Sequence, residues 1–210
     1  RIFNAMVAPI CRYRVKGTLW YQGENNTDRA QAYAPLFQSM ITDWRQQWRQ
    51  TDMPFYWVQL ANYKKAATTP TESDWATLRA AQNAALALPH TGQAVIIDVG
   101  EANDIHPHDK QTVAHRLALM ALRNDYGQTG VYCDSPQPVE AHTDAAGNVI
   151  VTFDHVARGL KAHNRYGYVN AFAIAGTDGH YQWAQAEVVG LSQIRIRTPR
   201  GMVPAKVRYA

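Results

Sequence analysis

The chain has 210 residues, of which 46% are hydrophobic and 18% charged, as in an ordinary soluble globular protein. No stretch approaches the roughly 20 continuous apolar residues of a transmembrane helix, so no membrane partner is expected. The formal charge of +4 comes from arginines scattered along the chain without a basic block, which argues against a nucleic-acid partner. The length allows one large α/β domain or a domain with a smaller companion.

Strand-like and helix-like stretches alternate through the first part of the chain. Apolar runs at 18–22 and 55–60 predict buried strands, and a third run at 94–99 is the clearest of the set. Between the first two runs, apolar residues recur every three to four positions from Asp28 to Gln50, which predicts an amphipathic helix. A second helix is expected to begin after Ser73 as its cap.

A further helix follows the third strand, with Asp109 expected as its N-terminal cap and Gly127 as its C-terminal cap. The alternation of strands and helices implies a mainly parallel sheet with helices on both faces. The loops that leave the carboxyl ends of parallel strands lie along one edge of the sheet, where open α/β folds bind their ligands. The residues expected to converge on this edge are Gln22, Glu24, Asn25, Asn62, Asp104 and His106.

The loop after the third strand, 100–116, concentrates ionisable side chains. Histidine is the side chain whose charge changes near neutral pH, so one hypothesis is a proton-transfer site. The other is a polar loop that turns a strand into a helix, with Pro107 fixing the turn. The composition of the loop does not decide between these two hypotheses. The histidines of this loop are His106, His108 and His115, and its acids include Glu101, Asp104 and Asp109.

Beyond Gly130 the pattern of the sequence changes: short runs in which apolar and polar residues alternate are separated by residues typical of turns. No stretch there has helical periodicity, so we expect a small antiparallel, sandwich-like β module over 130–210, packed on a domain that spans 1–129. The two cysteines, Cys11 and Cys133, match no metal-binding or redox spacing. They are therefore either free thiols or one disulfide.

Long motifs along the chain point to one family. They are W-Y-Q-G-E-N-N (20–26), M-I-T-D-W-R (40–45), F-Y-W-V-Q-L-A-N-Y (55–63), W-A-T-L-R-A-A-Q (75–82), I-D-V-G-E (97–101) and D-I-H-P-H-D-K-Q-T-V-A-H-R-L-A-L (104–119). These segments resemble the sialate O-acetylesterase family, carbohydrate esterases of the SGNH hydrolase superfamily. The segments F-A-I-A-G-T-D-G (172–179) and V-P-A-K-V-R-Y-A (203–210) resemble the C-terminal part of the same family.

The resemblance implies a three-layer α/β/α SGNH-hydrolase (flavodoxin-like) domain, incomplete at its N-terminus and followed by the β module. It implies a serine carboxylic-ester hydrolase that removes acetyl groups from an acetylated carbohydrate without a cofactor, in the periplasm or outside the cell. On this resemblance His106 is the general base. Gly23 and Asn25 fall where the superfamily has its Gly-x-Asn oxyanion block, and Gln22 and Glu24 belong to the same oxyanion and substrate-binding segment.

The nucleophile of the family is not found in this chain. The family carries its serine in a G-Q-S-N type motif, which is absent here. Ser39 falls in the middle of a predicted helix, and Ser73 is expected to be a cap. An upstream segment or a companion chain is therefore expected to carry the nucleophile, and this fragment alone is expected to be inactive. The serines present are Ser39, Ser73, Ser135 and Ser192.

The sequence also leaves two alternatives for the group that orients His106. The superfamily usually places an acid three residues before the histidine, and that position is Asn103. Asp104 is two residues before it, so either Asp104 or a backbone carbonyl orients the imidazole. Arg79 and Gln82 are interpreted as structural residues of a helix.

Two hypotheses from other functional classes remain. Asp104, His106 and His108 have side chains that suit a divalent metal, which would make the protein a metal-dependent hydrolase. Alternatively, aromatic side chains of the β module would stack on sugars in a non-catalytic carbohydrate-binding fragment. These aromatic residues are Tyr166, Tyr168, Tyr181 and Trp183.

Overall fold

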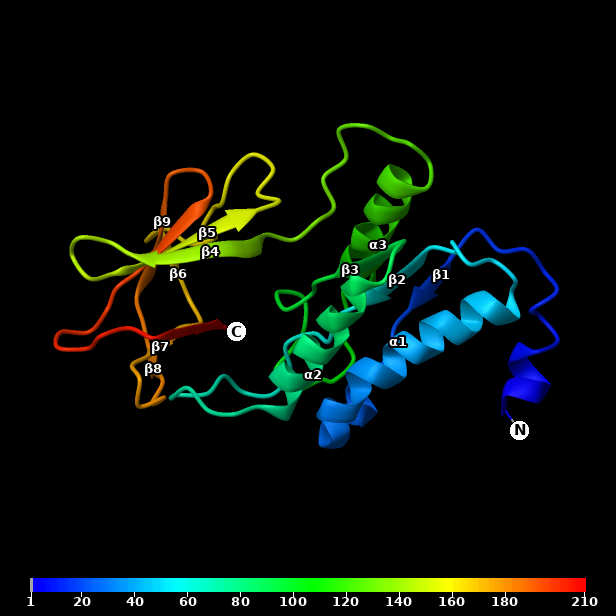
Figure 1. The fold of residues 1–210 in the computed structure, drawn as a ribbon, viewed down its shortest axis with the longest axis horizontal. Helices are drawn as coiled ribbons and strands as arrows, with labels where there is room; N and C mark the ends of the chain where they lie inside the picture. Colours follow the sequence, from blue (N-terminus) through cyan, green and yellow to red (C-terminus); the bar gives the residue numbers. More distant parts are fainter. Residues whose placement is uncertain (1) are drawn as a thin grey trace. The chain divides into compact units, whose positions relative to one another are not determined.

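The computed structural model describes residues 2–210, which form two compact units. The first comprises residues 2–65 and Ser73–Cys133, and contains the helices and the parallel strands (Figure 1). The second comprises Ala66–Glu72 and Asp134–Ala210, and its regular structure is β-strand. Parallel and antiparallel sheets therefore coexist in a mixed α/β chain.

The sheet of the first unit has the order β1-β2-β3, and both of its pairings are parallel, as the alternation of elements predicted. In register, Thr18 lies opposite Phe55, and Phe55 opposite Thr91. The strand β2 is buried throughout, as expected of an apolar run at the centre of a parallel sheet. The bounds are Thr18–Trp20 for β1, Phe55–Val58 for β2 and Thr91–Ala94 for β3.

Two helices of the first unit begin where their capping residues predict. The Ser73 hydroxyl accepts a hydrogen bond from the amide of Ala76, and the Asp109 carboxylate accepts one from Thr112. The longest helix starts at Ala30 rather than Asp28, because the preceding residues form a 3₁₀ turn. The α-helices are α1 (Ala30–Gln47), α2 (Asp74–Asn83) and α3 (Lys110–Asn124), and the shorter turns are η1 (Phe3–Val7), η2 (Glu24–Arg29) and η3 (Ala84–Ala87).

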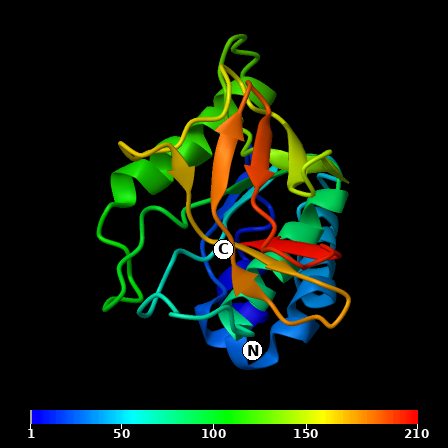
Figure 2. The same cartoon turned by 90° about the vertical axis from the view of Figure 1, so that its left-hand side faces the viewer.

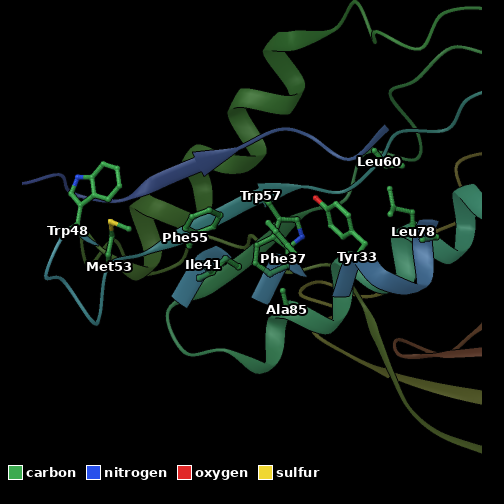
Figure 3. Close-up of a cluster of buried hydrophobic side chains, with 11 residues drawn as sticks. Tyr33, Phe37, Ile41, Trp48, Met53, Phe55, Trp57, Leu60, Leu78 and Ala85 are labelled. Carbon is green, nitrogen blue, oxygen red and sulfur yellow. The ribbon is translucent and has the colours of Figure 1, made fainter. Parts of the chain in front are cut away.

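An aromatic core fills the space between the sheet and the helices α1 and α2 (Figure 3). The ring of Phe37 from α1 meets the rings of Phe55 and Trp57 edge to face, with centroids 6.2 and 5.2 Å apart. Trp57 also donates a hydrogen bond from Nε1 to Oε1 of Gln93, over 2.8 Å, so its polar atom is satisfied. Since this core ties α1 and α2 to one face of β2, it fixes the position of the loops that follow the strands.

A second core covers the other face of the sheet, where α3 packs. Tyr56 and Val58 of β2 point to this face, because successive side chains of a strand alternate. They meet Val113, Leu117 and Met120, the buried apolar side chains of α3. Helices thus pack on both faces of the parallel sheet.

Both cysteines belong to the first unit and are not joined in a disulfide, which decides against the disulfide alternative. Cys11 packs against the core under α1 and α2, and Cys133 against the core under α3.

The hydroxyl of Tyr56 leads to a prediction on stability at high pH. It donates a hydrogen bond to Oδ2 of Asp125 over 2.8 Å. Burial, followed by this hydrogen bond, raises the pKa of Tyr56 from 10.0 to about 12. Because the folded protein holds this proton more tightly than the unfolded chain, the neutral hydroxyl contributes stability that is fully present below pH 10. This contribution is lost as the pH rises toward 12. Tyr56→Phe is expected to remove this contribution, on the order of 2 kcal/mol of pH-dependent stability.

The check is urea unfolding of the parent and Tyr56→Phe proteins between pH 9 and 12. The difference between their free energies of unfolding should shrink as the pH rises. Tyr13→Phe, which alters a tyrosine that is 72% exposed, is the matched control and should keep a constant difference. A pH-independent difference for Tyr56→Phe would contradict the assigned shift.

The predicted third strand, 94–99, is wrong in position. The strand β3 lies earlier, at Thr91–Ala94, and the apolar run continues beyond its end. Its ladder stops because β2 stops: Val58 pairs with Ala94, and the amide of Gln59 donates to the Ala94 carbonyl. Ile96 is nevertheless fully buried in the core under α3. The run is apolar because it enters that core, and not because it belongs to the sheet.

The second unit contains two antiparallel sheets, with orders β4-β5-β10-β9-β6 and β11-β7-β8. Figure 2 shows β9 and β10 side by side in orange and orange-red. The strands of this unit are short and antiparallel, as the alternating runs beyond Gly130 predicted. The bounds are β4 Gln137–Thr143, β5 Val149–Asp154, β6 Tyr168–Val169, β7 Phe172–Ala175, β8 Gln182–Trp183, β9 Ala186–Val189, β10 Gln193–Ile196 and β11 Lys206–Tyr209.

One hydrophobic core joins the two sheets of this unit. Val151 and Ile194 enter it from the larger sheet, and Phe172 and Ile174 from the smaller one. This arrangement agrees with the sandwich-like module that the alternating pattern predicted.

The segment Ala66–Glu72 belongs to the second unit, although it lies between β2 and α2 in sequence. Trp183 donates from Nε1 to the carbonyl of Thr68 over 3.0 Å, and Nη1 of Arg208 lies 2.9 Å from Oε1 of Glu72. The guanidinium of Arg208 also stacks 3.9 Å above the ring of Tyr181. Two of the aromatic side chains proposed to bind sugars, Tyr181 and Trp183, therefore make structural contacts around this segment.

Candidate active site

The first loop at the carboxyl edge of the sheet begins with Gly23, which is buried and has a φ angle of 153°. A Cβ atom at this position would lie 3.1 Å from Nε2 of Gln82, and 3.2 to 3.3 Å from methyl groups of Leu78 and Leu60. Both the backbone conformation and the crowding therefore require glycine here. This glycine lets the turn after β1 pass close to the helix α2.

Gln82 connects the first two loops of this edge. Its side chain is fully buried, and its Oε1 accepts a hydrogen bond from the amide of Leu60 over 2.9 Å. Its Nε2 donates to the carbonyls of Gln22 at 3.2 Å and Val58 at 3.4 Å. One carboxamide thus satisfies backbone groups at the ends of both β1 and β2. Gln82 has the structural role that the sequence indicated.

Gln22 and Glu24, two of the predicted substrate-binding residues, take part in the turn itself. The Gln22 side chain accepts from the hydroxyl of Tyr33 at 3.1 Å and donates to Oδ1 of Asn26 at 2.7 Å. Glu24 is half-buried, and after burial its charge is the second cause that raises the pKa of Tyr21. Asn25, by contrast, is exposed at the start of the 3₁₀ turn. Asn25 is therefore accessible to solvent.

The second loop is joined to the third by Asn62. Its Oδ1 accepts from the amide of Gly100 at 2.7 Å, and its Nδ2 donates to the Gly100 carbonyl at 3.2 Å. A Cβ atom on Gly100 would lie only 2.2 Å from the Asn62 carbonyl oxygen, so no other residue fits without moving the backbone. The start of the histidine-rich loop is therefore fixed to the end of β2.

Asp104 lies between two histidines of this loop. Its Oδ1 accepts a hydrogen bond from the backbone amide of His106 at 2.8 Å and lies 3.7 Å from Nδ1 of the same residue. Its Oδ2 lies 3.4 Å from Nε2 of His108. The side chain of His106 is 84% exposed, so its ring is accessible to a substrate. The sequence left open whether Asp104 or a backbone carbonyl orients His106, and it did not predict the contact between Asp104 and His108.

Contacts at the start of α3 bring the histidine-rich loop near the turn after β1. The ammonium group of Lys110 lies 4.9 Å from the centroid of the Tyr21 ring, which is a cation–π distance. Within residues 2–210, no hydrogen bond or ion pair joins His106 to Gly23, Glu24 or Asn25. These residues lie on loops that follow neighbouring strands of the sheet.

Arg116 holds the residues that precede the loop. Its Nη1 donates to the carbonyl of Val95 at 2.6 Å, and its two terminal nitrogens bind the carboxylate of Asp98 at 2.6 and 2.7 Å. The hydrogen bond to Asp98 raises the pKa of Arg116. This bidentate pair ties the segment after β3 to α3, so Arg116 anchors the loop.

The described part of the chain has no group of three or more His, Cys, Asp or Glu side chains arranged to hold a metal ion. His108, one of the three residues of the metal hypothesis, has both ring nitrogens directed at carboxylates. Among residues 2–210, no helix has the length and apolar character needed to cross a membrane.

A sequence model of a protein family matches residues 1–123, and its description reads "Carbohydrate esterase, sialic acid-specific acetylesterase". The match spans more than half of the 210 residues and covers every strand and nearly all helical residues of the first unit. The fold and this match place the chain in the class of carbohydrate esterases. Within this class, the chain belongs to the sialic acid-specific acetylesterase family, as its motifs predicted.

Similar proteins agree with this assignment. Sialate O-acetylesterase from Mus musculus is 31% identical over 206 residues, covering 89% of this chain and 37% of that protein. The Pongo abelii protein of the same name is 29% identical over 232 residues, covering 100% and 43%. A solved carbohydrate acetylesterase from Xanthomonas citri has a TM-score of 0.89 and 39% identity, covering 99% of this chain and 48% of that one. The chain thus spans less than half the length of each.

Proposed function

We propose that this chain supplies the general base and the oxyanion segment of an esterase that removes acetyl groups from an acetylated carbohydrate. The observation that carries the proposal is an exposed histidine, His106, with the Asp104 carboxylate beside it at the carboxyl edge of a parallel sheet. In this proposal the first unit is the C-terminal part of a three-layer α/β/α SGNH domain. Helices on both faces of the sheet support that layout.

The proposed reaction proceeds in two steps. A serine hydroxyl attacks the acetyl carbonyl while His106 accepts the hydroxyl proton, and the negative charge forms on the carbonyl oxygen. The Gly23 amide and the Asn25 carboxamide donate hydrogen bonds to that oxygen. The proton then passes from His106 to the departing sugar oxygen. Water hydrolyses the acetyl-serine by the same route, releasing acetate and free serine.

The serine itself is proposed to come from a segment or companion chain outside these 210 residues, and the isolated chain is proposed to be inactive. In the first unit Ser39 lies exposed on α1, and the hydroxyl of Ser73 is engaged as the cap of α2. The family resemblance further favours a periplasmic or secreted protein.

A serine-directed organophosphonate tests this proposal on the complete enzyme. We expect it to abolish acetate release from an O-acetylated glycan, and mass spectrometry should place the label on a serine other than Ser39, Ser73, Ser135 or Ser192. A chelator, as the parallel treatment, should leave the activity unchanged. Inhibition by the chelator alone would instead support the metal-dependent hydrolase and overturn the serine mechanism.

A further inference from the structure

We propose that His108, held by Glu101, is a positioning residue that fixes the Asp104 carboxylate against His106. The inference rests on the proposed role of His106 as general base. Nδ1 of His108 lies 2.6 Å from Oε1 of Glu101, and its Nε2 lies 3.4 Å from Oδ2 of Asp104. The other oxygen of Asp104 faces the amide and the ring of His106. The four side chains thus form a continuous polar chain.

Asp104 needs such support because its carboxylate lies on an irregular loop and is 39% exposed. An aspartate in this setting can rotate and exchange its partners for water. With Oδ2 directed at His108, the remaining oxygen Oδ1 is left on the side of His106, 3.7 Å from Nδ1. His108 therefore sets the direction of the oxygen that orients the base. A ring protonated at both nitrogens can donate to Glu101 and Asp104 together.

Glu101 is well placed to hold His108 because the loop is anchored just before it. Gly100 is fixed by two hydrogen bonds to Asn62, and the backbones of Glu101 and Asp104 form an antiparallel bridge. Oε1 of Glu101 also accepts from the amide of His108 at 3.4 Å. The hydrogen bonds between Asn62 and Gly100 therefore fix the start of the loop, and Glu101 and His108 extend this support to the Asp104 carboxylate beside His106.

His115 provides a matched control from the same region. It is exposed on α3, and across residues 2–210 its ring makes no hydrogen bond or ion pair. Replacing it removes a histidine at a similar place in sequence without touching the polar chain.

The test is a double-mutant cycle in the complete enzyme, with kcat and KM measured on 4-nitrophenyl acetate. His108→Ala is expected to lower kcat about tenfold with KM within about twofold, as for a small misplacement of the base. In an Asp104→Asn background the same change is expected to cost less than about twofold, since His108 acts through Asp104. His108→Gln, which keeps a donor for one carboxylate, should recover part of the loss, while His115→Ala should match the parent.

Equal losses for His108→Ala in the parent and in the Asp104→Asn protein would overturn the proposal, because a structural role would be additive. A parent-like kcat for either His108→Ala or Asp104→Asn would overturn it too. Failure of the underlying function has a different signature. If His106→Ala keeps its activity, the base is wrongly assigned; if it loses activity while the cycle is additive, only the role of His108 is refuted.

Discussion

His106→Ala in the complete enzyme is expected to lower kcat for 4-nitrophenyl acetate by at least about a hundredfold. Its ring is the exposed imidazole beside Asp104 at the sheet edge, and no other side chain near the Gly23 turn is proposed to accept the serine proton. Alanine removes the proton acceptor but leaves the oxyanion donors, so KM should change far less than kcat. Since the ring is 84% exposed, its loss should leave the thermal midpoint of unfolding nearly unchanged.

Steady-state kinetics and a thermal melt of the same preparation check both parts of this prediction. His115→Ala, an exposed histidine on α3, should keep the parent kcat and so controls for the loss of an imidazole as such. Activity of His106→Ala within a few-fold of the parent would refute His106 as the base. A large fall in the melting temperature would attribute lost activity to unfolding instead.

Sequence reasoning was most successful where the signal is local. The caps at Ser73 and Asp109 depend on a side chain and an amide three residues away, and both form as predicted. The buried strand β2 is likewise predicted by a continuous apolar run within a single element. Such features need no knowledge of what the rest of the chain does.

The third strand shows where local reasoning fails. The run at 94–99 is apolar and β-branched, yet the strand occupies Thr91–Ala94, which includes a glycine and a glutamine. The extent of a strand is set by its partner, and β2 ends at Val58, opposite Ala94. Gln93 is tolerated inside because its side chain accepts the indole hydrogen of Trp57. Neither fact is visible in the run itself.

For the candidate site, the sequence identified which loops share the edge, because parallel topology alone decides that. It did not predict that His108 and Glu101 extend the chain of contacts from Asp104, or that Asp98 binds Arg116. These pairings depend on how the loop folds back, and an irregular loop has no periodicity from which to infer them. A cluster of three acids around three histidines was the only available signal.

Gln82→Leu is expected to lower the free energy of unfolding by about 3 kcal/mol, the largest stability effect among these predictions. Leucine has a similar volume, so the packing against Leu78 and Leu60 is largely kept. The amide of Leu60 and the carbonyls of Gln22 and Val58 lose their partner inside the protein, and each unsatisfied buried group costs on the order of 1 kcal/mol or more. The corresponding fall in melting temperature is roughly 6 to 12 °C.

Urea unfolding followed by tryptophan fluorescence measures this effect, since Trp57 and Trp20 report on the core of the first unit. Gln47→Leu, which alters an exposed glutamine of α1, is the matched control and should change stability by less than about 0.5 kcal/mol. A loss below about 1 kcal/mol for Gln82→Leu would show that the carboxamide does not join the ends of β1 and β2. If the predicted loss is found, activity should fall as well under conditions where the variant is still folded. The same hydrogen bonds that stabilise this unit set the position of the Gly23 turn, on which the proposed oxyanion donors lie.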